Sequence, residues 1–339
     1  EKKELDVLLR EARLAVKQGA YGISSDFGFV SGGLASVKET VALGKIAKEF
    51  DVPHMIGLRD GRDGLMDSIE EVLKIAKDSG SKVIIDNLKP VKGSQRASKE
   101  ALERIEKVKD RSKIKFVVHP YEQSEVHIYS LLPLQYRKGR LEDMLAVIKE
   151  PKVRQTITEE WRSLDFRGAR ILSAPGHHFL VGKTIVDIAN NWGTSYIQAV
   201  LRVMEVSEMR ATIVYEDQVK SALRDLVANE SAFITADAAG GPMDRGFEEN
   251  PYAVDAFPVY LKLVLGEGLL SMEDAIKKVT LDVAKYFGLR DRGVVAEGKV
   301  ADLVLLGKDN YEVKEVVLAG QIRGQESLNG EVLTRTNQI

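Results

Sequence analysis

The sequence predicts an α/β fold of repeated strand–helix units, arranged as a (β/α) barrel or as a doubly wound sheet. Expected strands begin near residues 20, 52, 82 and 114, so successive strands start about 30 residues apart, the length of one βα unit. Each strand is a continuous apolar run, a pattern typical of parallel strands covered on both faces. Both features favour a sheet of parallel strands with helices packed against it.

Helical periodicity accompanies the expected strands. The strands are expected at residues 19–25, 52–58, 81–87 and 113–121. Apolar positions recur at helical spacing in residues 4–18, 36–50, 64–80 and 98–112. Ser36, with Glu39 three residues later, and Ser98 are expected to cap their helices, and Gly80 is expected to end the third helix.

The second half of the chain is less regular. We expect a helical insertion at 140–162, a strand at 169–174, a helix at 183–206, strands at 211–216 and 231–241, and helices within 251–288. From Gly293 onward, short strands alternate with turns, which predicts a small β layer. These features predict a portion of strand–helix units at 1–292, with an insertion at about 123–210, and a β portion at 293–339.

Composition narrows the classes of function. The 49 basic and 51 acidic residues nearly cancel, so the charge balance does not favour a nucleic-acid or membrane partner. No apolar run reaches the length of a membrane span. The chain has no cysteine, which excludes disulfides and thiolate chemistry and fits a cytoplasmic location. Its five histidines offer few imidazoles for a metal site.

Polar side chains gather where the expected strands end. In parallel βα folds these carboxyl ends form one rim, and functional groups lie there. The residues concerned are Ser24, Ser25, Asp26, Arg59, Asp60, Asp86, Asn87, Lys89, His119, Tyr121 and Asp237. So many polar strand ends predict a small-molecule site at the rim. Asp237 follows a buried run and precedes a Gly-rich loop, so it is a candidate general base or metal ligand, with a local cap as the alternative.

The stretch VIIDNLKP, residues 83–90, is the most informative strand end. Strand alternation predicts that Ile85 and Asn87 share one face, the interior if the sheet closes into a barrel, while Asp86 points the other way as a cap or ion-pair partner. Lys89, two residues after Asn87, is then suited to holding an anionic substrate.

Several motifs resemble those of the amidohydrolase superfamily, and within it those of the N-acyl-D-amino-acid deacylase (D-aminoacylase) branch. They are GAYGISS, IGLRDGRD, VIIDNLK, HPY, ITADAAG and GVVAEGKVADLVLLG, and they run in order along essentially the whole chain. The resemblance implies a (β/α)8 TIM-type barrel, whose later half lies in this chain, with a small β-sandwich at the C-terminus. It also implies zinc at the rim, which activates a water for attack on an amide.

The resemblance also assigns roles to residues. Asp237 matches the catalytic acid and a metal ligand. Lys89, Arg59 and Tyr121 match positions that bind the substrate or line its pocket. His119, which replaces a family tyrosine, and Ser25 are further candidates for substrate binding. Gly57 and Asn87 occupy positions of family histidines. Glycine has no side-chain donor and a neutral amide binds zinc poorly, so the ligand set is depleted.

Two functions follow from this resemblance. The first is hydrolysis of the C–N bond of an acylated amino acid, with Asp237 as base. The second is a catalytically degenerate subunit that binds, scaffolds or regulates. A phosphate-binding barrel is a weaker third hypothesis, because residues 238–241 (AAGG) are only a minimal anion loop.

The number of expected strands also predicts a partner. About five strands cannot close an eight-stranded barrel, and an unpaired edge favours aggregation. The chain begins with Glu1 rather than methionine, so it reads as a processed or truncated product. We therefore expect another polypeptide, either a separate chain or a cleaved N-terminal fragment, to supply the missing barrel half within a homo- or hetero-oligomer.

Overall fold

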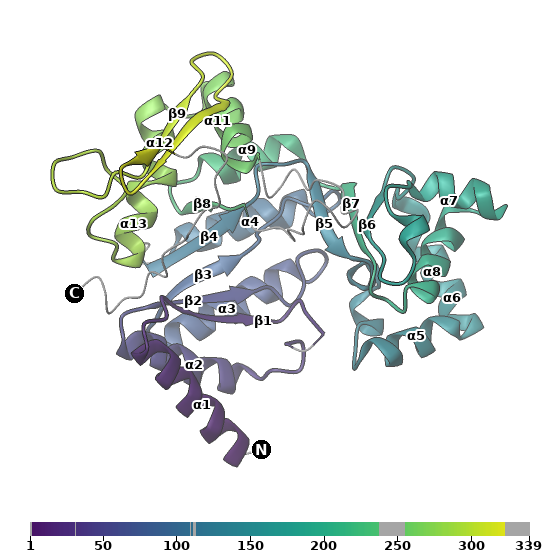
Figure 1. Ribbon diagram of the computed structural model, residues 1–339. Helices are drawn as coiled ribbons and strands as arrows, with labels where there is room; N and C mark the ends of the chain where they lie inside the picture. The colour runs from purple at the N-terminus through teal and green to yellow at the C-terminus, as the bar shows by residue number, and fades with distance from the viewer. Residues whose placement is uncertain (1, 31, 109, 111–112, 237–254, 323–339) are drawn as a thin grey trace.

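Five parallel strands form the main sheet of the protein (Figure 1). The structure is a computed structural model, and it describes residues 2–30, 32–108, 110, 113–236 and 255–322. The strand order is β1-β2-β3-β4-β8. The strands are β1 (Ile23–Asp26), β2 (Pro53–Gly57), β3 (Lys82–Asp86), β4 (Ile114–Val118) and β8 (Ala232–Ile234). The prediction of parallel strands is confirmed, because all four pairings are parallel.

One face of the main sheet packs against helices that connect its strands. These helices include α2 (Val37–Glu49), α3 (Leu65–Ser79), α4 (Gln95–Glu106) and α9 (Lys220–Ala228), while α1 (Lys2–Lys17) packs on α2. Ile85 belongs to the buried cluster on this helical face, together with Ile69 and Ile105. Ile84 belongs to a second cluster on the opposite face, with Tyr286 packed against it. The prediction that Ile85 faces the barrel interior was therefore wrong, because Ile85 faces the helices and its neighbour Ile84 lies on the opposite face.

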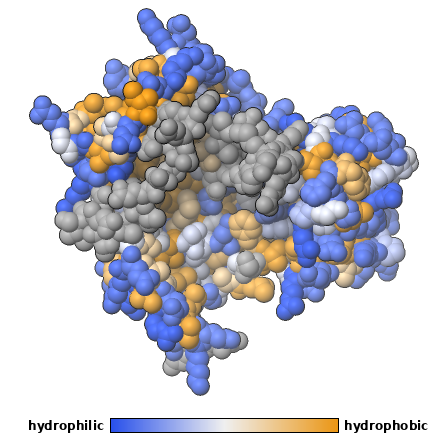
Figure 2. Space-filling model, in the orientation of Figure 1, coloured by the Kyte–Doolittle hydropathy of each residue, from blue (hydrophilic) through white to orange (hydrophobic). Residues whose placement is uncertain are grey.

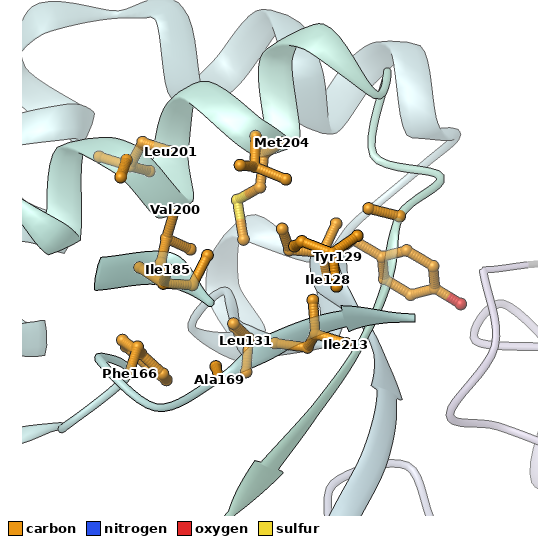
Figure 3. Close-up of a cluster of buried hydrophobic side chains, with 14 of the residues drawn as sticks. Ile128, Tyr129, Leu131, Phe166, Ala169, Ile185, Val200, Leu201, Met204 and Ile213 are labelled. Carbon is orange, nitrogen blue, oxygen red and sulfur yellow. The ribbon is translucent and has the colours of Figure 1, made fainter. Parts of the chain in front are cut away.

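Residues 123–216, the insertion lobe, form a separate body beside the main sheet (Figure 1). Its antiparallel sheet has the order β5-β7-β6, with β5 (Gln123–His127), β6 (Arg170–Ser173) and β7 (Thr212–Glu216). Its helices are α5 (Leu141–Lys149), α6 (Pro151–Glu160), α7 (Ile185–Trp192) and α8 (Tyr196–Val206). The insertion lobe has its own hydrophobic core, which includes Met204 of α8 and Ile213 of β7 (Figure 3).

The C-terminal part adds three helices and a small antiparallel sheet. The helices are α11 (Ala256–Gly266), α12 (Met272–Val279) and α13 (Leu281–Phe287). The strands are β9 (Leu303–Leu306), β10 (Val313–Leu318) and β11 (Gln321–Ile322), in the order β11-β10-β9. Val304 and Leu305 of β9 are more than half exposed, and Figure 2 shows hydrophobic residues gathered in this region of the surface.

Three local expectations need correction. Helix α4 begins at Gln95 rather than at Ser98, whose hydroxyl donates inside the helix to the Ser94 carbonyl at 3.0 Å. The helix expected at 183–206 is two helices, because Gly193 is left-handed (φ 61°) and Ser195 caps a new start. Strand β5 was missed because its sequence, QSEVH, is mostly polar and becomes a strand by pairing with β7.

None of the helices within the described ranges combines the length and the apolar character needed to cross a bilayer.

Candidate functional site

A pocket of about 220 Å³ lies where the carboxyl ends of the main-sheet strands meet the insertion lobe. We call it the rim pocket. Its acidic lining residues are Asp26, Asp60, Asp86, Glu125 and Asp217, and its basic ones are Lys89, Arg62 and Arg137. A pocket with this lining suits a small polar or charged molecule.

The end of β3 brings three polar residues into the pocket together. Asn87 has a left-handed backbone (φ 55°), which ends the strand alternation after Asp86. As a result, Asp86, Asn87 and Lys89 all line the pocket, and the prediction that Asp86 points away from the site was wrong. The Asn87 Oδ1 atom is buried and accepts no hydrogen bond from the residues that the structure describes. A donor that reached this oxygen would satisfy its hydrogen-bonding capacity.

Lys89 is a cation without an ion pair in this pocket, as far as the described residues go. Burial lowers the pKa of its ammonium, and the nearby Arg62 charge lowers it further, while Asp217, Asp86 and Glu125 raise it. A ligand carboxylate would offset the loss of hydration that burial imposes on this ammonium.

The two arginines of the pocket have partners that join the rim to the insertion lobe. Arg62 forms an ion pair with Asp217 (Nη2 to Oδ2, 2.9 Å) and donates to the Tyr215 hydroxyl. Arg137 lies 3.4 Å from Asp60 (Nη2 to Oδ1), whose carboxylate also accepts the backbone N–H of Arg62 at 3.0 Å. These contacts hold the loop after β2 against the insertion lobe.

Asp26 occupies the space beside Gly57. Asp26 and Gly57 are paired in the register of β1 and β2. A Cβ atom built on Gly57 would lie 2.3 Å from Asp26 Oδ1, closer than any real contact. A side chain at position 57 therefore requires Asp26 to move.

Two other predicted residues, Arg59 and Ser25, do not line the rim pocket. Arg59 pairs with Glu71 (Nη2 to Oε1, 3.0 Å) and donates to the Gly33 carbonyl at 2.6 Å, so it anchors the loop after β1. The Ser25 hydroxyl lies 2.9 Å from Nε2 of the buried His54. Asp237, the predicted base, lies outside the described residues.

Two predicted residues at the end of β4 have shifted pKa values. Burial lowers the pKa of His119 to about 4, and the positive charge of Lys89 contributes to the shift. Burial raises the pKa of Tyr121 to about 12, with a smaller effect of Asp255. Both side chains are therefore neutral near pH 7 and suited to hydrogen bonding rather than to charge.

The sequence predictions missed the basic and acidic residues that surround Lys89. Arg62, Arg137, Glu125 and Asp217 were not candidates, although all four line the pocket. Asp217 follows the expected strand at 211–216 directly, so the same strand-end signal could have found it. Arg137 lies in irregular chain and carried no such signal.

The described donors do not fit the zinc that the resemblance implies. Within the described ranges, no three His, Asp or Glu side chains are arranged to hold a metal ion. Gly57 has no donor and Asp26 fills its side-chain space, while Asn87 offers only a neutral amide. We therefore assign no metal chemistry to these residues.

Comparison with known protein families identifies the family of this chain. A sequence model of the amidohydrolase family matches residues 59–323. The chain belongs to this family. The N-acyl-D-glutamate deacylase of Alcaligenes xylosoxydans xylosoxydans is 23% identical over 310 residues, which cover 91% of this chain and 56% of that relative. A dihydroorotase of Endomicrobium trichonymphae is 30% identical over 128 residues, covering 35% of this chain and 30% of its own length.

Solved amidohydrolase structures share the fold. An N-acyl-D-glutamate deacylase from Bordetella bronchiseptica, complexed with zinc and a phosphonate inhibitor, has a TM-score of 0.73 at 20% identity, over 95% of this chain and 63% of that one. A D-aminoacylase has a TM-score of 0.74 at 20% identity, over 98% and 65%. The chain thus spans less than two thirds of the length of these relatives, and the likeness establishes the fold.

Proposed function

We propose that this amidohydrolase binds an acylated amino acid in the rim pocket and that its described residues serve binding rather than metal-dependent hydrolysis. The observation that carries this proposal is Lys89, an ammonium that lines the pocket with no ion pair to any described residue. The carboxylate of an acyl amino acid is the partner that its chemistry favours.

Lys89 is more open to a ligand carboxylate than the two arginines of the pocket are. Arg62 is engaged by Asp217, and Arg137 lies beside Asp60, so neither arginine is as open to a new anion as Lys89. The named activity of one relative, deacylation of N-acyl-D-glutamate, concerns a molecule of this class. We therefore place the ligand's α-carboxylate at Lys89 and its amide near Asn87.

Hydrolysis of the C–N bond is the second candidate function. It is favoured by membership of a family of hydrolases and by the sequence position of Asp237, after the apolar strand β8. Asp237 would accept the proton of a water that attacks the amide carbonyl. The absence of a fitting donor set among the described residues makes this candidate second to binding.

Calorimetry with N-acetyl-D-glutamate tests the binding proposal. Lys89→Met should weaken binding by at least tenfold, because a hydrogen bond to a charged group contributes about 1.5–3 kcal/mol. Lys99→Met, which removes an exposed lysine on α4, should leave the dissociation constant unchanged. Equal affinity of the wild type and Lys89→Met would overturn the proposal.

Metal analysis and an amine-release assay on the same protein separate the two candidates. Stoichiometric zinc, with turnover that is lost in Asp237→Asn, would establish hydrolysis. Binding of N-acetyl-D-glutamate with neither zinc nor turnover would establish the binding role.

We also propose that this chain forms the later half of a (β/α)8 barrel whose other strands come from another polypeptide, either a separate chain or a cleaved N-terminal fragment. Strands β1 and β8 are the edges of the main sheet, and no described strand pairs with their outer sides. Open parallel edges are rarely left uncovered. Light scattering should therefore find an oligomer, and a stable monomer with the circular dichroism of a closed barrel would overturn this proposal.

A further inference from the structure

A second pocket lies next to the rim pocket and has a different character. Its volume is also about 220 Å³. Its apolar lining residues are Phe27, Phe29, Val30, Leu34, Leu134 and Met144, and its charged ones are Arg59, Arg137 and Lys138. They come from the loop after β1 and from the insertion lobe, so the pocket exists only where these two parts meet. We call it the apolar pocket.

The two pockets share one wall. Phe29, Tyr129 and Arg137 line both of them. The Phe29 ring lies edge-on to His127 at 5.4 Å, and His127 stacks on Tyr129 at the same centroid distance. Figure 3 shows the Tyr129 ring at the edge of the insertion-lobe core, with its hydroxyl directed away from the other labelled side chains. A single ligand lying along this aromatic wall would reach from one pocket into the other.

Arg137 provides a hydrogen-bond donor at the junction. Its guanidinium contacts Asp60 Oδ1 at 3.4 Å and the Ser130 carbonyl at 3.5 Å, both long distances. Its Nε atom is buried, and no described residue accepts a hydrogen bond from it. A carbonyl oxygen that reaches this point would satisfy the buried N–H.

The mouth of the apolar pocket exposes large hydrophobic side chains. Leu34 is 80% exposed, Phe29 46% and Leu134 43%. Scattered exposed apolar residues are ordinary, but these three surround one pocket that adjoins a charged one. An apolar chain lying against them would remove their surface from water.

We propose that the apolar pocket binds the acyl chain of an N-acyl amino acid whose carboxylate lies at Lys89. The ligand class is then an amino acid with an acyl chain of several methylenes, rather than an N-acetyl or N-formyl amino acid. The acyl carbonyl lies at the Arg137 Nε–H, between the two pockets. This inference rests on the proposed binding function and names the ligand class of the same site.

A chain-length series tests the inference directly. N-acetyl-, N-hexanoyl- and N-decanoyl-D-glutamate share one head group and differ only in the acyl chain. Calorimetry should show affinity rising about two- to fourfold per added methylene until the pocket is full, as expected for burial of apolar surface. Equal affinity across the series would overturn the acyl-chain assignment.

Two variants locate the effect. Leu34→Asp places a charge at the mouth of the apolar pocket, and its high exposure means that folding does not depend on it. This variant should bind N-acetyl-D-glutamate as the wild type does but lose most of the gain from hexanoyl and decanoyl chains. Val295→Asp, at an 84% exposed site in the C-terminal part, is the matched control and should keep the full gain.

The outcomes distinguish this inference from the function on which it rests. Binding of N-acetyl-D-glutamate with no gain from longer chains would overturn the acyl-chain pocket and leave the carboxylate site standing. Failure of all three ligands to bind would overturn both. A gain that survives equally in Leu34→Asp and Val295→Asp would place the chain elsewhere on the protein and overturn the assignment to this pocket.

Discussion

Lys89 and Arg137 are both cations lining one pocket, yet they come from different parts of the molecule and have different surroundings. Lys89 follows β3 of the main sheet and has no ion pair among the described residues, whereas Arg137, in the insertion lobe, lies beside Asp60. The two cations therefore have different roles in the pocket. Lys89 presents a charge that a ligand can neutralise, whereas Arg62 and Arg137 are partly compensated by Asp217 and Asp60 and hold the rim loop against the insertion lobe.

The insertion lobe and the main sheet also have separate hydrophobic cores. The buried cluster of the insertion lobe, around Met204 and Ile213, is separate from the cluster between the main sheet and its helices. Charged and aromatic side chains, rather than a shared apolar core, form the contact at the rim pocket. We therefore expect the two parts to differ in their response to mutations in either core.

The largest expected effect comes from the core of the insertion lobe. Trp161 is 2% exposed, and Trp161→Ala should cost about 3–5 kcal/mol, the usual range for such cavities. If the two cores are independent, amide hydrogen exchange should accelerate across residues 123–216 and stay slow in the main sheet. Phe116→Ala, in the main-sheet core, is the matched control and should give the opposite pattern. Uniform acceleration in both variants would show that the parts unfold as one.

The next effect concerns a buried base in the main sheet. His54 is fully buried beside Ser25, and burial lowers its pKa from 6.5 to about 4. The unfolded chain therefore binds a proton between these values that the folded chain does not. This contribution to the free energy of unfolding is fully present above about pH 6.5 and is lost as the pH falls toward 4, by at most about 3 kcal/mol.

Urea unfolding at pH 7 and at pH 4.5 measures this loss. His54→Gln keeps a hydrogen-bonding side chain near Ser25 but cannot take up a proton, so its stability should fall less between the two pH values. His178→Gln, at an exposed site in the insertion lobe, should change with pH as the wild type does. Identical pH dependence in His54→Gln and the wild type would contradict the assignment.

Sequence periodicity predicted the main sheet well and the pocket only in part. Parallel strands are buried apolar runs, so their positions and the polar residues that follow them, such as Lys89, could be found from local pattern. The facing of Ile85 could not, because the left-handed turn at Asn87 comes from packing and loop geometry. Arg137 reaches the pocket only through the tertiary position of the insertion lobe, which no short-range pattern encodes.

The smallest expected effect concerns the rim itself, at Gly57, the position where the family resemblance implies a histidine. Gly57→Ala should destabilise the protein by about 1–3 kcal/mol, because its Cβ would overlap the Asp26 carboxylate and force it to move. In an Asp26→Gly background the same substitution should cost much less, so the two changes should couple in a double-mutant cycle. Gly61→Ala, in the loop that follows β2 and with nothing within 4 Å of its Cβ position, controls for the loss of a glycine. Additive effects at positions 26 and 57 would mean that Asp26 does not fill this space.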